Sequence, residues 1–242
     1  MDTTLNQDVV AEIWRPVVLT FESACSFDNP FLDVEIWAEF AGPSGRVVRR
    51  EAYWDGDRTY RVSFAPTELG AWNYVIEAPE QTGLNGRAGR INAVPYTGEL
   101  DLYRHGFIRV ADNPHLFAYA DGTPFFWLGD THWEFAYRES WDKSNHPGMT
   151  SQFCGMVDLR AKQGFTVYQT NLRSDMGAAD RYWIDGGMPK GAEDLPNVAF
   201  YQQELDRRMA YIADAGLVNA LGQSKLIERL TLYKGLVAIL GK

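Results

Sequence analysis

The sequence lacks the features that mark membrane proteins and secreted precursors. No uninterrupted apolar run approaches the roughly 20 residues that a membrane-spanning helix needs. The opening residues, MDTTLNQDVVAEIW, contain no basic segment followed by an apolar one, so the sequence as written carries no secretory signal. These absences predict a cytoplasmic protein without a membrane partner, unless a different start conceals an export signal.

Cysteine and histidine are scarce and are not spaced as metal ligands. Cys25 and Cys154 are far apart, which favours free buried thiols in a reducing compartment over a disulfide. No CxxC or HxxxH spacing occurs anywhere in the chain, and this disfavours a metal-dependent hydrolase. The four histidines are scattered: His105, His115, His132 and His146. The sequence therefore predicts no metal and no cofactor.

Positive charge is also in short supply. The chain has 23 Lys and Arg against 32 Asp and Glu, a net charge of −9, so no basic field would attract nucleic acid. Hydrophobic residues at 45% and aromatic residues at 14% are sufficient for a core and argue against disorder. The aromatic content suits carbohydrate contacts, and it equally suits the core of a β-sandwich.

The first part of the chain has the pattern of short, alternating β-strands separated by turns. Such regular strands predict an immunoglobulin-like antiparallel β-sandwich over residues 1–96. The expected strands are 15–21, 33–40, 46–53, 59–64, 70–77 and 89–94. We expect three tryptophans, Trp37, Trp54 and Trp72, to be inter-sheet core or corner residues. A sugar-binding platform built from them is the alternative.

After residue 123 the pattern changes to alternating strands and helices. Residues 97–123 are predicted to be a connector with a β-hairpin, and residues 124–242 to hold about three β/α units of an incomplete TIM-type barrel. The fold class is thus multi-domain, β followed by α/β. The expected elements are a strand at 124–128 buried on both faces, helices at 148–163, 200–215 and 225–240, and strands at 165–172 and 217–222. A long loop, 173–197, interrupts this pattern.

Polar residues follow the first of these strands at once. Asp130, Thr131 and His132 come directly after Gly129, with Trp133 behind them. Ligands of parallel α/β proteins bind at the carboxyl ends of the strands, and an acid, a hydroxyl, an imidazole and an indole there resemble a sugar site. The alternative is a helix N-cap at Asp130 or Thr131, with the imidazole and indole packed nearby.

Two sets of motifs resemble known families. Trp14-Arg-Pro, Tyr53-Trp-Asp-Gly56 and Leu69-Gly-Ala-Trp72 are similar to the immunoglobulin-like domain of unknown function that precedes certain glycoside hydrolase barrels. The second half resembles the apiosidase-like catalytic barrel. It does so through Tyr119-Ala-Asp-Gly122, Phe126-Trp-Leu-Gly-Asp-Thr-His-Trp133, Gly164-Phe-Thr-Val167 and Ala215-Gly-Leu217.

The resemblance implies a (β/α)₈ glycosidase that acts on plant or microbial polysaccharide with two carboxylates. Such barrels usually carry these carboxylates on later strands, around the fourth and seventh. The catalytic pair is therefore expected beyond Lys242, with this chain as an N-terminal portion. Three parallel strands alone would leave open sheet edges, which predicts self-association.

By position, seven strand-end residues are candidates for binding a carbohydrate. They are Asp130, His132, Trp133, Gln169, Asn171, Arg173 and Gln223. Asp130 paired with Asp175 or Asp185 is a weaker catalytic hypothesis. The structural alternatives are helix capping, a buried imidazole, loop hydrogen bonds and solvated loop acids.

Two classes of function remain open. The first is an apiosidase-like glycoside hydrolase whose accessory sandwich and first barrel units are carried by this chain. The second is a non-catalytic carbohydrate-binding or assembly module, with an inactive truncated product as a further possibility.

Overall fold

The computed structural model describes residues 8–133, 135–136, 138–171 and 195–222. The chain divides into two compact units. Unit 1 is Met1–Ile108 with Tyr119–Asp121, and unit 2 is Arg109–Ala118 with Gly122–Lys242. Several expectations lie outside the described residues: the predicted helix at 225–240, most of the long loop, and Arg173, Asp175, Asp185 and Gln223.

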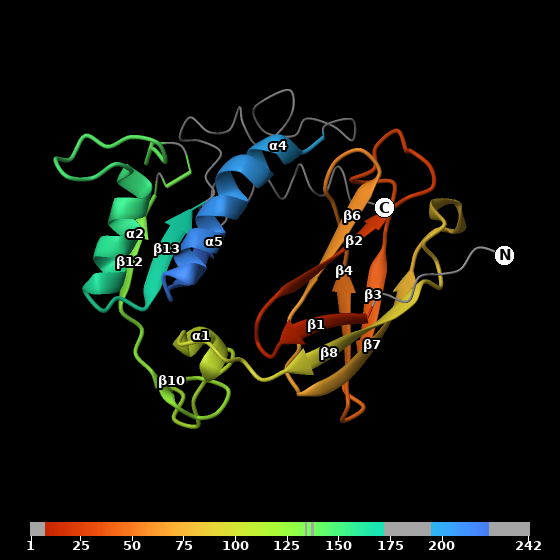
Figure 1. The fold of residues 1–242 in the computed structure, drawn as a ribbon, viewed down its shortest axis with the longest axis horizontal. Helices are drawn as coiled ribbons and strands as arrows, with labels where there is room; N and C mark the ends of the chain where they lie inside the picture. The colour runs from red at the N-terminus through yellow and green to blue at the C-terminus, as the bar shows by residue number, and fades with distance from the viewer. Residues whose placement is uncertain (1–7, 134, 137, 172–194, 223–242) are drawn as a thin grey trace. The chain divides into compact units, whose positions relative to one another are not determined.

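Unit 1 is built from two β-sheets (Figure 1). The first has the order β1 (Asp8–Glu12), β8 (Ala88–Val94), β7 (Gly70–Glu77), β3 (Trp37–Ala41) and β4 (Val47–Glu51). Its β1 and β8 pair in parallel, whereas its other pairs are antiparallel. The second sheet is antiparallel, with the order β2 (Val17–Glu22), β6 (Thr59–Phe64) and β5 (Tyr53–Trp54). Two short helical segments follow β7 and β8, η1 (Glu80–Thr82) and α1 (Asp101–Arg104).

One hydrophobic cluster joins these two sheets. Phe40 of β3 and Phe64 of β6 stack with their ring centroids 3.9 Å apart. Trp72 is fully buried beside them, and its indole N–H donates to the Glu68 carbonyl at 2.9 Å. Burial of these aromatic side chains together with the aliphatic ones of the same cluster stabilises unit 1.

The three predicted core tryptophans have different positions. Trp72 is in the core, as predicted, and Trp54 packs against the core while partly buried. The prediction is wrong for Trp37, which lies on the other face of β3, with the Arg49 guanidinium 4.4 Å from its ring centroid. Strand alternation explains this, because Ala38 and Phe40 are the buried positions of β3.

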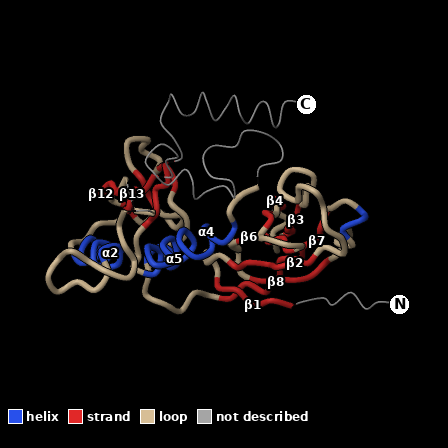
Figure 2. The backbone as a smooth tube through the Cα atoms, turned by 90° about the horizontal axis from the view of Figure 1, so that it is seen from above, coloured by secondary structure: helices blue, strands red, loops and turns tan. Residues whose placement is uncertain are grey.

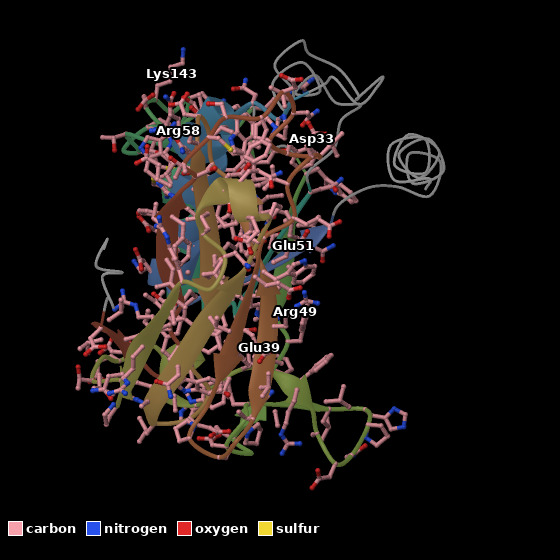
Figure 3. All side chains as sticks on the ribbon, turned by 90° about the vertical axis from the view of Figure 1, so that its right-hand side faces the viewer. Asp33, Glu39, Arg49, Glu51, Arg58 and Lys143 are labelled. Carbon is pink, nitrogen blue, oxygen red and sulfur yellow. The ribbon has the colours of Figure 1, made fainter. Side chains whose placement is uncertain are left out.

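The outward face of the larger sheet is charged. Glu39, Arg49 and Glu51 lie along this face (Figure 3). Glu39 is directly opposite Arg49 in the β3–β4 register, and opposite charges facing each other stabilise a strand pair. The pattern of one apolar and one polar face is what the sequence alternation predicts.

Strand β1 was not predicted from the sequence. It pairs with β8, which lies about 80 residues later in the chain; Val9, for example, is opposite Ile91. Parallel pairing over about 80 residues has no local turn signal, so the sequence pattern did not reveal it.

Unit 2 contains two further sheets. A small antiparallel sheet has the order β11 (Pro124–Phe125), β10 (Phe117–Ala118) and β9 (Arg109–Val110). A parallel sheet has the order β12 (Gly129–His132), β13 (Val167–Asn171) and β14 (Val218–Gly222).

The predicted strand at 124–128, buried on both faces, is wrong. Residues 124–125 pair antiparallel with β10, and Phe126 and Trp127 are 74% and 44% exposed. The parallel strand begins only at Gly129, so Asp130 and His132 lie within it instead of after it. An unbroken apolar run cannot distinguish a buried strand from two shorter segments in different sheets.

Two helical segments pack on the parallel sheet (Figure 2). The first, α2 (Gln152–Lys162), begins after Ser151, whose hydroxyl accepts from the Cys154 N–H at 3.0 Å. The second runs continuously through α4 (Val198–Phe200), the π-helical segment η2 (Tyr201–Asp206) and α5 (Arg207–Asp214). In the part of the chain that the structure describes, no helix has the length and apolar character needed to cross a bilayer.

Candidate functional site

The register of the parallel sheet separates its polar residues into two sets. Asp130 of β12 lies beside Tyr168 of β13 and Asn219 of β14. Thr131 lies beside Gln169. Because successive side chains of a strand point to opposite faces, these two rows are on opposite sides of the sheet.

The helices identify one of these sides. The ring centroids of Phe153 in α2 and Tyr168 are 6.3 Å apart, and the Met209 sulfur of α5 accepts from the Asn219 amide. We call this side the helix face, with Asp130, His132, Tyr168, Thr170 and Asn219 as its residues. We call the other side the opposite face, with Thr131, Gln169 and Asn171 as its polar residues.

His132 lies between two carboxylates on the helix face. Its Nδ1 is 3.0 Å from Glu139 Oε1, and its Nε2 is 3.2 Å from Asp130 Oδ2. The imidazole stacks on Tyr168 with the centroids 4.1 Å apart, and only 7% of the histidine is exposed. An imidazole protonated at both nitrogens donates to both carboxylates, whereas a neutral one donates to a single carboxylate.

Asp130 is an ion-paired carboxylate. Its Oδ2 accepts from Arg160 Nε at 2.5 Å, and its Oδ1 accepts from the Thr131 N–H at 2.9 Å. Burial alone would raise the pKa of Asp130, but the Arg160 hydrogen bond, the nearby His132 and the Thr131 N–H together lower this pKa below its ordinary value. The N-cap alternative is wrong for the described residues, because the next helix is α2 and Ser151 caps it.

Tyr168 and Glu139 extend this network. The Tyr168 hydroxyl donates to Glu139 Oε2 at 3.3 Å. Burial, followed by the nearby Glu139 charge, raises the pKa of Tyr168, so the phenol remains a hydrogen-bond donor. Arg160, Asp130, His132, Glu139 and Tyr168 thus form one continuous hydrogen-bonded chain.

Arg208 connects the segment after β12 to the helix. It is 3% exposed, its Nε donates to the Phe135 carbonyl and its Nη2 to the Glu139 carbonyl, both at 2.9 Å. Burial lowers the pKa of Arg208, although Glu204, which forms an ion pair with it, acts in the other direction. For Glu204, burial acts to raise the pKa. The neighbouring Arg207 and Arg208 have the larger combined effect, so the pKa of Glu204 is lowered.

The predicted carbohydrate-binding residues are therefore not one cluster. Asp130 and His132 come together on the helix face, whereas Gln169 and Asn171 belong to the opposite face. Gln169 is exposed and Asn171 is 6% exposed. Trp133 follows β12 in a turn and is 47% exposed. Arg173 and Gln223 lie outside the described residues.

The sequence interpretation missed four members of the helix-face network. These are Glu139, Arg160, Tyr168 and Arg208. Strand alternation could have separated Asp130 and His132 from Thr131. Helical periodicity could have found Arg160, because it lies seven residues after Phe153 on the sheet-facing side of α2. For Glu139 and Arg208, 69 residues apart, the sequence contains no local signal.

The described residues contain no group of three His, Cys, Asp or Glu side chains arranged to hold a metal ion. The carboxylates beside His132 instead bind Arg160 and Tyr168.

With parallel β/α units and polar residues in its strands, unit 2 has the features of a parallel α/β domain. Comparison with known proteins finds a family model that matches part of each unit. Residues 10–79 match the family model described as a domain of unknown function, DUF5060, and residues 111–224 match the model described as Apiosidase-like, catalytic domain. One part of the chain is thus similar to DUF5060 domains and another to apiosidase-like catalytic domains, and these matches confirm the resemblance in its motifs.

A solved structure has a similar fold. It comes from Bacteroides vulgatus ATCC 8482 and is described as a "putative glycoside hydrolase". The TM-score is 0.62 at 23% sequence identity, over 89% of this chain and 41% of that one. This chain thus spans less than half the length of that protein. No curated protein sequence matches this chain significantly.

Proposed function

We propose that this chain is part of a glycoside hydrolase of the apiosidase-like type, and that the opposite face of its parallel sheet contributes to a carbohydrate-binding site. The register is the observation that carries this proposal. It places Thr131 next to Gln169 at the carboxyl end of the sheet, with Asn171 two residues further along β13. Ligands of parallel α/β proteins bind at this end.

The proposal includes the architecture of the whole enzyme. We infer that residues 1–96 are an immunoglobulin-like sandwich, residues 97–123 a connector, and residues 124–242 the first β/α units of a (β/α)₈ barrel. The shared core of the two sheets in unit 1 and the β12–α2–β13–α5–β14 order in unit 2 support this inference.

The available side chains suit sugar hydroxyls. The hydroxyl of Thr131 and the amides of Gln169 and Asn171 can each donate and accept hydrogen bonds. The exposed indole of Trp133 offers a flat apolar surface for a sugar ring. Asp130 and His132 have their polar atoms engaged on the helix face, so we assign them to holding the strand end in place.

A non-catalytic carbohydrate-binding module is the second candidate. It is favoured by one observation: in the described register, the opposite-face positions Thr131, Gln169, Asn171, Ala220 and Gly222 include no acid. Hydrolysis by the two-carboxylate mechanism would need acids from elsewhere in the protein.

Hydrolysis and binding assays on this chain would separate the candidates. The substrates would be aryl glycosides and pectin-derived oligosaccharides, with calorimetric titration of the same ligands. We expect the chain to bind at least one of these sugars, and we expect Gln169→Ala to weaken this binding. Turnover that Asp130→Asn abolishes, with folding intact, would contradict our assignment of Asp130, and the absence of binding to any sugar would contradict the proposed site.

A further inference from the structure

A cavity in unit 2 lies next to the hydrogen-bonded network of the helix face, with Glu139 belonging to both. Its volume is about 300 Å³, which falls within the range of small-molecule sites. One wall comes from residues 136 and 138–143 after β12, and the other from the junction of η2 and α5. Its charged lining residues are Arg138, Glu139, Asp142, Lys143, Glu204, Arg207 and Arg208.

Two of the three acids in this lining are already engaged. Glu139 accepts from Tyr168 and lies against His132. Glu204 is ion-paired with Arg207 and Arg208. The remaining acid, Asp142, is exposed. The lining also contains Arg138, Lys143, Arg207 and Arg208, so its cations outnumber its acids by one.

Arg207 retains capacity to bind a further acceptor. Its Nη2 donates to Glu204 at 2.9 Å, and its guanidinium lies 4.5 Å from the centroid of the Trp141 ring. Its buried Nε has no hydrogen-bond partner among the described residues. This Nε is closed to solvent, but the Arg207 side chain as a whole is 34% exposed and lines the cavity, so the exposed part of this cation can reach an anionic ligand there.

The cavity wall is also held in place. Arg208 fixes the carbonyls of Phe135 and Glu139, and the Trp141 ring packs on Phe153 at 5.6 Å. A site formed by such packed elements loses little conformational entropy on binding a ligand. Lys143 also lines the cavity and is exposed, so it adds long-range positive charge. Figure 3 shows its side chain projecting from the surface.

We propose that this cavity binds the oxyanion group of a small molecule, a carboxylate or a phosphate, through the Arg207 guanidinium. The two oxyanion chemistries share the same requirement, a charge-assisted hydrogen bond from a partly buried cation. The volume leaves room for a ligand larger than an inorganic ion. This site does not depend on the proposed carbohydrate-binding site, because none of its lining residues belongs to the opposite face.

Inorganic phosphate and acetate, titrated separately into the full chain by calorimetry, test the proposal. We expect at least one of them to bind in the millimolar range and to raise the melting temperature. Arg207→Met keeps the apolar stem on Trp141 and should weaken this binding about tenfold or more, as expected for one charge-assisted hydrogen bond. The matched control Lys162→Met removes an exposed cation of α2 and should leave binding unchanged.

Lys143→Met provides a second variant if Arg207→Met does not fold. Because Lys143 acts at longer range, its loss should weaken binding several-fold at low salt and less at high salt. Binding that is equally strong in both cavity variants and the control would overturn the proposal, as would the absence of binding by both anions. The anion that binds with the higher affinity identifies the oxyanion group of the ligand as a carboxylate or a phosphate.

Discussion

At the scale of single residues, neighbours in the sequence have separate roles. Asp130 and His132 have their polar atoms bound on the helix face, whereas Thr131, between them, belongs to the opposite face. The pKa of Asp130 is lowered because its partners favour the charged form more than burial disfavours it. Structural support and ligand binding can therefore be tested separately in adjacent residues.

Asp130→Asn should destabilise unit 2 by about 1–3 kcal/mol at neutral pH, the cost of losing a charge-assisted hydrogen bond. Because the folded pKa lies below the ordinary value, the stabilisation is complete above that ordinary value and is lost as the pH falls through the lowered folded pKa. Urea unfolding at neutral and acidic pH measures this. A variant whose acid sensitivity equals that of the original chain would contradict the role of the ion pair.

Trp133→Ala should change carbohydrate binding, whereas His132→Ala should change stability. Trp133 is exposed, so its loss should weaken oligosaccharide binding about tenfold while leaving the melting temperature nearly unchanged. His132 is buried in the network, so its loss should cost about 1–3 kcal/mol of stability. Calorimetric titration and thermal unfolding of both variants check this. Equal stability losses in the two variants would refute the separation of faces.

At the scale of elements, a buried arginine connects two segments that the chain keeps far apart. Arg208 of α5 donates to backbone carbonyls in the segment that follows β12. In this segment the Phe135 and Glu139 carbonyls accept from the Arg208 side chain, whereas the Ser140 and Lys143 carbonyls accept from backbone N–H groups at the start of α2. The continuous α4–η2–α5 helix presents that guanidinium on its buried side.

Arg208→Leu should destabilise unit 2 by about 1–3 kcal/mol, because the Phe135 and Glu139 carbonyls lose their Arg208 donor, while Glu204 keeps its ion pair with Arg207. Hydrogen exchange of the backbone amides at 135–143 should increase in the same variant. The control Lys162→Leu changes an exposed position and should alter neither quantity. Unchanged exchange at 135–143 would show that Arg208 does not hold this segment.

At the scale of the whole molecule, apolar surface and strand edges remain exposed. In the described residues, β12 and β14 each pair on one side only. Phe117, Phe126 and Trp127 are 39%, 74% and 44% exposed. Contiguous apolar exposure of this kind commonly marks an interaction surface.

We expect the chain to self-associate as its concentration rises, as measured by sedimentation velocity. Phe126→Ser should shift this equilibrium toward the monomer, whereas Phe31→Ser, at a 43% exposed position in unit 1, should not. A single monomeric species at all concentrations would contradict the prediction.

A fragment of residues 1–96 should fold alone, since the hydrophobic cluster of unit 1 lies within it. The test is a two-dimensional amide NMR spectrum. Dispersed resonances are expected, and a collapsed spectrum would contradict this domain boundary.

The sequence by itself determined most of the local structure. Six strands of unit 1, the β/α order of unit 2 and the ends of α2 and α5 follow from alternation, periodicity and the glycines Gly164 and Gly216, both with positive φ. These features depend on neighbours a few residues apart, which a sequence pattern records. The motifs also indicated both families.

The tertiary structure alone decided the long-range contacts. The pairing of β1 with β8, the assignment of Pro124 and Phe125 to a separate sheet, and the Glu139–Arg208 contact join residues with no local relation. Strand register also decided which polar side chains of β12 and β13 share a face. A shift of one residue would exchange the two faces, because the side-chain period of a strand is two.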